Sequence, residues 1–537
     1  MNKFKKILLA FTMMWAVMAC DLDKLDNPNS VSPANSDVDF VLNQVQLSFA
    51  GLFFGMSDYG MQMTRLQHFY GPTYEAGFSA QSFDGFWSTA YSGVLINTKT
   101  LIPAAEANSQ FVHAGIAQVL EAYTLMSLVD YFGDVPYSEA LDANNFNPVA
   151  DDGSDIYVAA TEKLDEALAN FAKTSLANPK NDIYYAGNKA RWITLAKTLK
   201  LRALVQTRLV NTGAKAGIEA LVTENDLIDS SAEDFNFKYS TVIANPDSRH
   251  PYFIGDYLQG AGYYKSNYLM NEMYKAKPIV DPRIRYYFYR QVSSTTSDVN
   301  KLNCITVEAP AHYVAEWPFC AVGDGYWGRD FGDFSGTPPD TFDRTAFGIY
   351  PAGGRFDGNF YKGVDPAMGL QGAGILPIYN SANTYFMLAE AALTLGANVG
   401  SAKTRMLDGI QRSVDKAKSF TTSEVPTALV PTTNFVNNYK NYVGGLYDAA
   451  TSDDARLEII VKEYWLSLFG NGIDAFNTYR RTGKPGGLQG GLILNMGTAY
   501  RSFTYPSQYV TRNSNATQKP NNGVTVFWDT NPANFID

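Results

Sequence analysis

The sequence predicts a mainly α-helical fold built from helical hairpin repeats, with a loop-rich, irregular subdomain inserted between them. Apolar residues recur at the three-and-four spacing of a buried helical face over residues 38–224 and again over 378–485. From about residue 225 to residue 377 this period is lost, and glycine, proline and aromatic residues cluster instead. We therefore expect two sets of helices that flank one long region of loops.

The clearest helical hairpin lies near the C-terminus, over residues 453–485. Thr451 and Asp454 form a capping-box start, and Gly470 and Gly472 end the first helix. A second, shorter helix then runs to two arginines, which the helix dipole favours at a C-terminus, before Gly483 ends it. The predicted inward side chains are Leu457, Ile460, Val461, Tyr464, Leu468, Ile473, Phe476 and Tyr479.

The same periodicity predicts the other helices. Paired amphipathic helices of this length are typical of tetratricopeptide-like repeats. Residues 55–86 fit neither a helix nor a strand, so we expect an aromatic loop there. The predicted helices cover residues 38–54, a segment that starts at Trp87, and residues 114–132, 156–171, 188–209, 381–395 and 401–419.

The first nineteen residues have the pattern of a lipoprotein signal peptide. Three lysines precede an apolar segment, residues 7–16, that is too short to remain as a membrane-spanning helix. The cleavage site Val17-Met18-Ala19-Cys20 then predicts an acylated Cys20, although an ordinary signal peptide followed by a chance cysteine is the alternative. Residues 20–37 are polar and rich in proline and asparagine, so they predict a tether, and residues 38–537 form the body. No later stretch is expected to be apolar enough to span a membrane.

The composition limits the kinds of partner. Apolar residues make up 46% of the 537, enough for a large core. Removal of the three signal lysines changes the formal net charge from −10 to −13, which argues against nucleic acid as a partner. Aromatic residues reach 14%, including 34 tyrosines. They fit either flat platforms for sugar rings and peptide side chains or the filling of a large core.

Several segments, taken together, resemble the SusD/RagB family of Bacteroidetes outer-membrane nutrient-binding lipoproteins. The C-terminal hairpin carries LFGNGIDAFNTYRRTGKP, and Asp21 and Asp23 after the lipidated cysteine resemble the family's export signal to the cell surface. The other matching segments are VDYFGDVPYSEAL (129–141), NKARWITLAKTLKLRALVQTRL (188–209), DPRIRYYFYR (281–290), NTYFMLAEAALTLG (383–396), FTYPSQYVTRN (503–513) and VFWD (526–529).

The resemblance implies a SusD-like fold and a binding function. Such proteins capture an oligosaccharide, or sometimes a peptide, and cover a SusC-like TonB-dependent transporter as a hinged lid. They are palmitate-anchored in the outer membrane, face the outside and need no cofactor. Two other interpretations remain open, a surface glycan hydrolase and a surface protein with a purely structural role.

Motifs of catalysis and of metal binding are absent from the sequence. There is no HExxH, GxSxG or P-loop pattern, and the four histidines are scattered, so no catalytic or metal-binding residue is predicted. The aspartates of two loops, either Asp324, Asp330 and Asp333 or Asp151, Asp152 and Asp155, leave room for a structural calcium ion. Solvated loop carboxylates are the simpler interpretation.

Cys304 and Cys320 are the only thiols left once Cys20 is acylated, and an exported protein meets an oxidising compartment. We therefore predict a disulfide that fixes the aromatic residues of its loop as a ligand platform, although the same residues would also serve as a small local core. A second aromatic region, over residues 70–87, is the alternative ligand-binding site. The candidate ligand-binding residues are Tyr313, Trp317, Phe319, Tyr326, Trp327, Asp324, Arg329 and Asp330, and in the second region Tyr70, Tyr74, Phe86 and Trp87.

Overall fold

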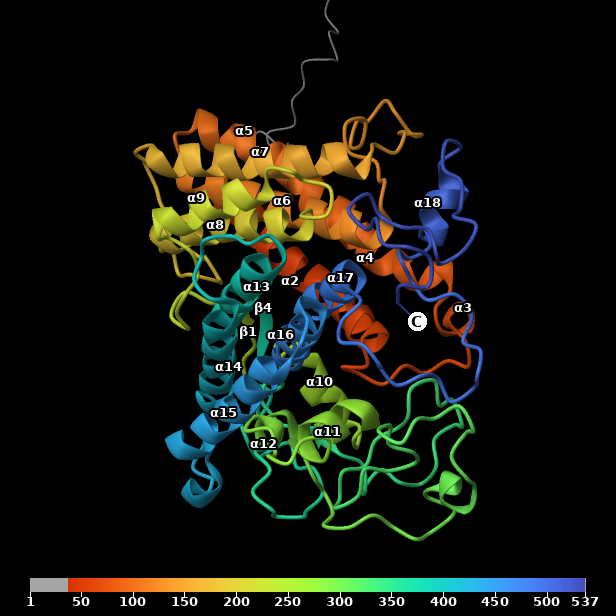
Figure 1. Cartoon of the computed structure of the whole chain (residues 1–537). Coiled ribbons are helices and arrows are strands. Elements are labelled where there is room, and N and C mark those ends of the chain that lie inside the picture. The colour runs from red at the N-terminus through yellow and green to blue at the C-terminus, as the bar shows by residue number, and fades with distance from the viewer. Residues whose placement is uncertain (1–36, 537) are drawn as a thin grey trace, which may run out of the picture.

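The computed structural model describes residues 37–536 (Figure 1). The signal peptide, Cys20 and residues 20–36 of the tether lie outside the described residues. Most of the chain forms helices in two groups, and a loop-rich region closes one end of the molecule (Figure 1).

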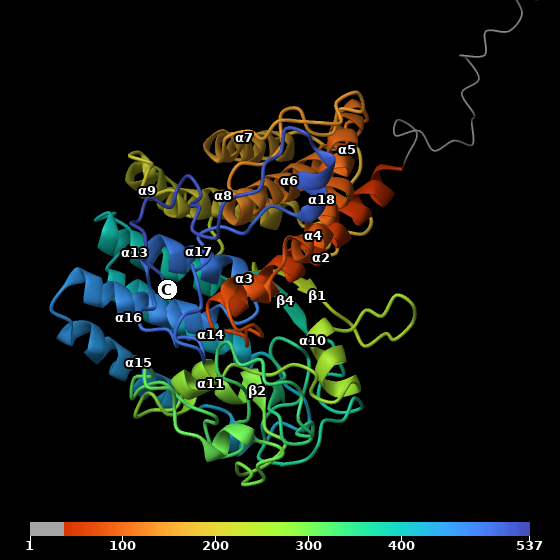
Figure 2. The same cartoon turned by 90° about the vertical axis from the view of Figure 1, so that its right-hand side faces the viewer.

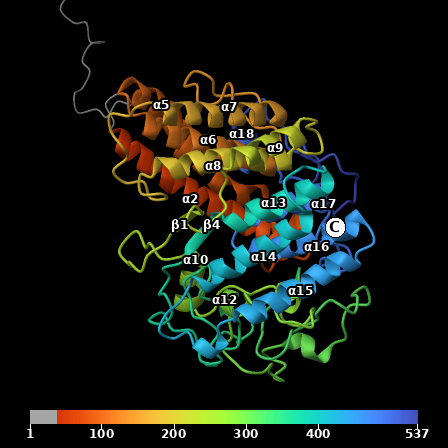
Figure 3. The same ribbon diagram turned by 60° about the vertical axis from the view of Figure 1, so that its left-hand side comes forward.

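The first group of helices surrounds an almost completely buried helix. In helix α6 (Phe111–Phe132) every residue from Val112 onward is buried, and the helix contacts its neighbours on several sides. The helices of this group are α2 (Val38–Met63), α5 (Ile96–Ala107), α6, α7 (Gly153–Ala172), α8 (Lys189–Gln206) and α9 (Ala214–Glu224). Figures 1 and 3 show most of these helices across the top of the molecule, with α2 running from them down into its centre.

Two of these helices correct an expectation from the sequence. By length and composition, both α2 and α6 are apolar enough to cross a membrane. However, the most apolar part of α6 is 100% buried inside this body and that of α2 is 56% buried, so they are core helices.

The second group of helices packs below the first. It comprises α13 (Ser381–Thr394), α14 (Ala402–Lys418), α15 (Thr433–Ala449), α16 (Asp453–Ser467) and α17 (Gly472–Thr482), and neighbouring members contact each other. Helix α17 joins the two groups because it crosses α2 closely. A Cβ atom at Gly60 would lie 2.1 Å from the Gly472 carbonyl oxygen, so this crossing requires glycine.

The loop-rich region lies at the opposite end from α6 (Figures 1 and 2). Two small antiparallel sheets support it: β1 (Phe235–Lys238) pairs with β4 (Ile375–Tyr379), and β2 (Phe288–Tyr289) pairs with β3 (Ala346–Phe347). Phe235 lies opposite Tyr379, and a bulge follows. The short helices here are α10 (Pro251–Phe253), α11 (Asn267–Tyr274) and α12 (Ile284–Tyr287), and elsewhere α3 (Tyr74–Gly77), α4 (Asp84–Ser88) and α18 (Ser507–Arg512).

Buried polar residues from four of the quoted sequence segments meet in one network between the two helical groups. The Asp130 carboxylate accepts hydrogen bonds from Arg202 Nη2 at 3.0 Å and from Trp528 Nε1 at 3.0 Å. Arg202 also donates to Asp474 at 2.8 Å, and Arg480 donates to the Asp130 carbonyl oxygen at 2.6 Å. Since buried charges are costly unless they are paired, these motif residues hold the fold together.

Asp134, the acid of the VDYFGD turn, has a local structural role. Its Oδ1 accepts a hydrogen bond at 2.8 Å from the backbone N–H of Gly153, the first residue of α7. The side chain thus satisfies one of the free amides at that helix start.

The structure corrects several predicted helix boundaries. Helix α2 continues to Met63, nine residues past its predicted end, so Tyr59 lies in a helix and not in a loop. The helix expected to start at Trp87 begins at Asp84, and the N-cap of α16 is Ser452 rather than Thr451. Helices α9 and α15 were not predicted.

Candidate functional site

The predicted disulfide between Cys304 and Cys320 is present, and it closes the loop that carries three candidate aromatic residues. The Tyr313 ring meets the Trp317 ring at 5.5 Å and the Phe319 ring at 6.0 Å, both nearly perpendicular. All three side chains are partly exposed.

Hydrogen bonds fix this loop to a segment near the C-terminus. Trp317 Nε1 donates to the Gly487 carbonyl oxygen at 3.0 Å, and His312 Nε2 lies 2.9 Å from the Gly491 carbonyl oxygen. Gln489 Nε2 also donates to the Pro318 carbonyl oxygen at 2.8 Å. The Trp317 indole is thus held by its N–H while part of its ring faces solvent.

Tyr70, from the second predicted region, is linked to the disulfide loop through residues 331–334 and Gln489. Its hydroxyl donates to the Phe334 carbonyl oxygen at 3.0 Å, and the two side chains are 53% and 45% exposed. The backbone N–H of Phe331 donates to Gln489 Oε1, and Gln489 in turn contacts the disulfide loop. We call this surface the aromatic edge and define it as Tyr70, Tyr313, Trp317, Phe319 and Phe334.

Four candidates beside the disulfide loop are buried and take no part in the exposed aromatic surface. Trp327 is 2% exposed, and its indole N–H donates to the Asp340 carboxylate at 3.1 Å. Arg329 donates to the Tyr264 hydroxyl at 3.1 Å, and Tyr326 packs on Tyr274. These contacts lie within the fold, so the three side chains support the loops from inside.

Asp330 is the fourth of these buried candidates, and it is a structural carboxylate. It accepts hydrogen bonds at 2.9 Å from Asn267 Nδ2 and from the backbone N–H of Cys320. Burial raises its pKa to about 6, partly offset by these hydrogen bonds. Asp324 is exposed but lies 3.5 Å from the Lys275 ammonium group, away from the three rings of the disulfide loop.

Three candidates of the second region are also buried. Tyr74, Phe86 and Trp87 are 3%, 7% and 8% exposed. Trp87 packs against the Tyr509 ring at 4.8 Å. Of the four candidates in this region, Tyr70 alone reaches the surface, because α3 and α4 carry the other three rings into the core.

The structure gives no support to a calcium site. Within residues 37–536 no cluster of three or more His, Cys, Asp or Glu side chains is arranged to hold a metal ion. Asp151 accepts hydrogen bonds from the backbone N–H groups of Tyr137 and Ser138, and Asp333 accepts one from that of Ser335. These carboxylates stabilise turns.

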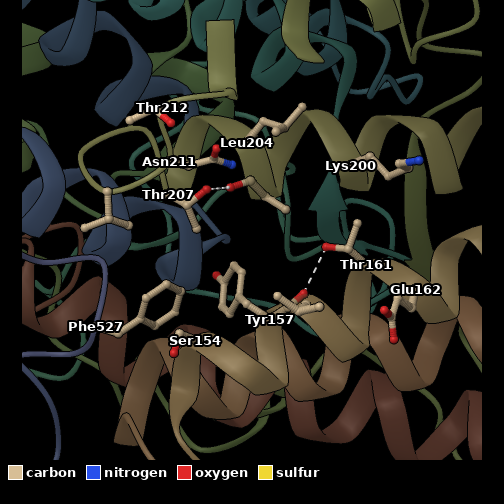
Figure 4. Close-up of a pocket in the computed structure, with 13 residues that line it drawn as sticks. Ser154, Tyr157, Thr161, Glu162, Lys200, Leu204, Thr207, Asn211, Thr212 and Phe527 are labelled. Carbon is tan, nitrogen blue, oxygen red and sulfur yellow. Dashed lines mark hydrogen bonds between the residues drawn. The ribbon is translucent and has the colours of Figure 1, made fainter. Parts of the chain in front are cut away.

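A separate cavity of about 650 Å³ lies between α7 and α8 (Figure 4). Tyr157 and Phe527 meet at one end with ring centroids 5.1 Å apart. The Tyr157 hydroxyl is already used, since it donates to Asp130 at 2.5 Å. Val158, Leu204 and Val210 line the cavity together with polar residues that include Glu162, Lys200 and Asn211.

Comparison with solved structures supports the fold. A SusD/RagB family protein from Bacteroides thetaiotaomicron has a TM-score of 0.68 at 18% identity, with 93% of this chain and 100% of that chain covered. A chitin-binding SusD homologue from Flavobacterium johnsoniae has a TM-score of 0.64 at 19% identity, with coverage of 92% and 100%. A SusD homologue from Bacteroides fragilis has 0.61 at 16%, with coverage of 87% and 94%. Among curated protein sequences, none matches this chain.

Two family models match the sequence itself. One, described as starch-binding and associating with the outer membrane, matches residues 33–310, which is more than half of the chain. The other, described as SusD and RagB outer membrane lipoprotein, matches residues 368–525. The chain therefore belongs to the SusD/RagB family of outer-membrane lipoproteins, which are binding proteins and not enzymes.

Proposed function

We propose that this lipoprotein captures a glycan at the aromatic edge on the cell surface and delivers it to a SusC-like TonB-dependent transporter, for which it acts as a lid. The observation that carries the proposal is the set of partly exposed rings that a disulfide and several hydrogen bonds hold in place. Family membership supports the same function, and one structural relative is described as chitin-binding.

The geometry of the aromatic edge suits sugar rings. The apolar faces of pyranose rings stack on flat aromatic surfaces, which are large and lose little conformational entropy on binding. Trp317 is held by its indole N–H and Tyr70 by its hydroxyl, so both rings are oriented before a ligand arrives. Stacking does not depend on a particular hydroxyl pattern, so glycans of more than one linkage fit this mode of binding.

Delivery to a transporter requires a body that can move relative to the membrane. The described body begins directly before α2, and residues 20–37 would connect that helix to a lipid on Cys20. A fully extended tether of this length reaches roughly 60 Å. Such a reach permits a lid to open and close while it stays attached to the outer membrane.

The experiment that tests this function measures binding and cleavage together. The mature protein is incubated with starch and chitin oligosaccharides and with a peptide library, and free ligand and new reducing ends are both quantified. We expect depletion of a glycan without new reducing ends. Release of shorter products would favour the surface hydrolase, and binding of peptides alone would change the ligand class.

A separate experiment tests the transporter. Affinity purification of the tagged lipoprotein from solubilised outer membranes should recover a SusC-like barrel in comparable amount. Recovery of the lipoprotein without any such barrel would contradict the delivery step while leaving glycan capture in place.

A further inference from the structure

A second cavity, of about 550 Å³, opens beside α12 and the start of α15. In Figure 1 these two helices lie at the lower left, whereas the green segment that carries the disulfide loop lies at the lower right. The volume of this cavity is in the range of small-ligand pockets. We call it the arginine pocket, after Arg285 and Arg290 in its wall.

The charges of the arginine pocket do not balance. Asp281, Arg285 and Arg290 are the charged residues that line it. Asp281 is neutralised from behind, because the Arg283 guanidinium lies 2.6 Å from it. The two lining arginines therefore depend on other acids for compensation.

Those two arginines share one buried carboxylate. Arg290 Nε donates to Asp357 Oδ2 at 2.6 Å, and Arg285 Nη1 lies 3.9 Å from Asp357 Oδ1. Both also donate to Asn359 Oδ1, a neutral acceptor, at 2.7 and 2.9 Å. Asp324 contributes only its carbonyl oxygen to Arg290, and its carboxylate faces Lys275. One positive charge is thus left over.

Of the two arginines, Arg285 is the one that can offer this positive charge to a ligand. Its side chain is 28% exposed, compared with 7% for Arg290. Within the described part of the chain, the hydrogen bonds of Arg285 all come from Nη1, so Nε and Nη2 remain available as two parallel donors. This pair of donors matches the two oxygens of a carboxylate.

Tyrosine rings form the remaining polar part of the wall. Tyr326 packs on Tyr274 at 4.8 Å, and the Arg290 guanidinium lies 4.8 Å from the Tyr326 centroid and 5.3 Å from that of Tyr361. Tyr361 is 38% exposed and has a φ of 52°, a backbone conformation that costs free energy for a bulky residue. The fold thus tolerates an unfavourable backbone conformation at the residue whose ring lies in the exposed part of the pocket wall.

We propose that the arginine pocket is a second binding subsite, which takes the carboxylate-bearing ring of an acidic sugar. The carboxylate would pair with Arg285 and the sugar ring would lie against Tyr361 and Tyr274. This inference rests on the proposed glycan-binding function, which it extends to acidic glycans. Since the mature chain has a formal net charge of −13, a local cation is needed to hold an acidic ligand on this surface.

The test uses calorimetric titration of the mature protein with trigalacturonic acid and with its methyl ester, which has the same rings but no carboxylates. We expect the acid to bind at least tenfold more tightly than the ester, and its binding to weaken at high salt. Arg285→Gln should lose at least tenfold in affinity at an unchanged Tm. Arg191→Gln, which removes an arginine of α8 far from the pocket, is the matched control and should bind as wild type does.

Other results would overturn the subsite. Equal affinity for acid and ester, no binding of the acid, or wild-type affinity in Arg285→Gln would each contradict it. Equal competition by acetate or by a tripeptide with a free C-terminus would show a general anion or peptide site and would also contradict it.

The variant Trp317→Ala separates this inference from the proposed function. We expect it to bind trigalacturonic acid at the pocket while it loses neutral glycans. If Trp317→Ala no longer binds trigalacturonic acid but Arg285→Gln still does, the subsite is refuted and the aromatic edge remains the glycan site. Suppose instead that only Arg285→Gln loses binding of trigalacturonic acid and that the wild type binds no neutral glycan. That result would refute the aromatic edge as a glycan site and leave the subsite in place.

Discussion

Glu390 shows how single residues of the sequence motifs act in this fold. It belongs to the NTYFMLAEAALTLG segment of α13, and it accepts hydrogen bonds at 2.8 Å from both Nε and Nη2 of Arg481, a residue of the C-terminal hairpin. Arg208, from the end of the α8 segment, adds a third at 2.7 Å. Burial alone would raise the pKa of this carboxyl, but the two arginines outweigh it and lower the pKa from 4.5 to about 2.

This low pKa gives a pH-dependent prediction. Because the folded state binds the proton less tightly than the unfolded chain does, Glu390 stabilises the fold above pH 4.5 and loses this effect as the pH falls toward 2. Glu390→Gln should lower the free energy of unfolding by about 3 kcal/mol at pH 7. Urea titrations at pH 7 and pH 3 should show this difference shrink at the lower pH. A difference of equal size at both values would contradict the assignment.

Substitution of two buried aromatic residues of the C-terminal hairpin should strongly destabilise the fold. Trp465 is 2% exposed and donates its indole N–H to the Thr64 carbonyl oxygen at 2.8 Å, and Phe476 is 1% exposed. Trp465→Ala and Phe476→Ala should each cost about 3 to 5 kcal/mol as large-to-small core changes. Phe40→Ala, at a ring of α2 that is 74% exposed, is the control and should change stability by less than about 0.5 kcal/mol. An unchanged Tm in either hairpin variant would place that residue on a surface.

At the scale of elements, the sequence predicted regular helices far better than their ends. The α6 and α13 bounds follow directly from a long apolar period, within three residues at the start of α6 and one at the end of α13. The predicted end of α2 comes too early because Gly55 and Gly60, which have weak helix propensity, suggest a break. In the structure, burial of Met56, Met61 and Met63 outweighs this weak propensity of glycine, and the helix continues.

The candidate site was predictable only in part for a related reason. Trp317 and Trp327 lie ten residues apart in the same aromatic stretch, and a loop has no period that tells which ring faces inward. The difference arises from distant partners, since Trp327 bonds to Asp340 and Trp317 to Gly487. Phe334 and the arginine pocket were missed because their neighbours come from separate parts of the chain, although DPRIRYYFYR does contain both lining arginines.

The disulfide loop carries a prediction at this scale. Cys320 lies 16 positions after Cys304, and closing a loop of this length stabilises a fold by about 3 kcal/mol in the chain-entropy model. The Cys304→Ser/Cys320→Ser double variant should lose stability of that order, and also glycan affinity, because Tyr313, Trp317 and Phe319 become mobile. Calorimetry and binding assays of oxidised wild type, reduced wild type and the double variant check this. Wild-type affinity in the double variant would show that the hydrogen bonds to residues 487–491 are sufficient to hold the rings.

At the scale of the whole molecule, the two groups of helices pack together, and loops lie at the end opposite α6 (Figures 1 and 2). Family membership places this body at the outer membrane, and the sequence predicts that the lipid anchor is on Cys20. Cys20→Ala should abolish acylation, so the protein should leave the membrane fraction or remain uncleaved. Ser30→Ala, a change within the same tether, should keep the wild-type location. Surface-exposed, membrane-bound Cys20→Ala protein would contradict the anchor.

The most direct test of glycan capture is the affinity of Tyr70→Ala and Trp317→Ala for a neutral glycan that the wild type binds, measured by titration together with Tm and with new reducing ends. Phe146→Ala, at a ring that is 81% exposed outside the aromatic edge, is the matched control. The account predicts at least a tenfold loss of affinity in both edge variants at an unchanged Tm, wild-type affinity in the control and no reducing ends. Wild-type affinity in both edge variants, or release of shorter sugars, would contradict it.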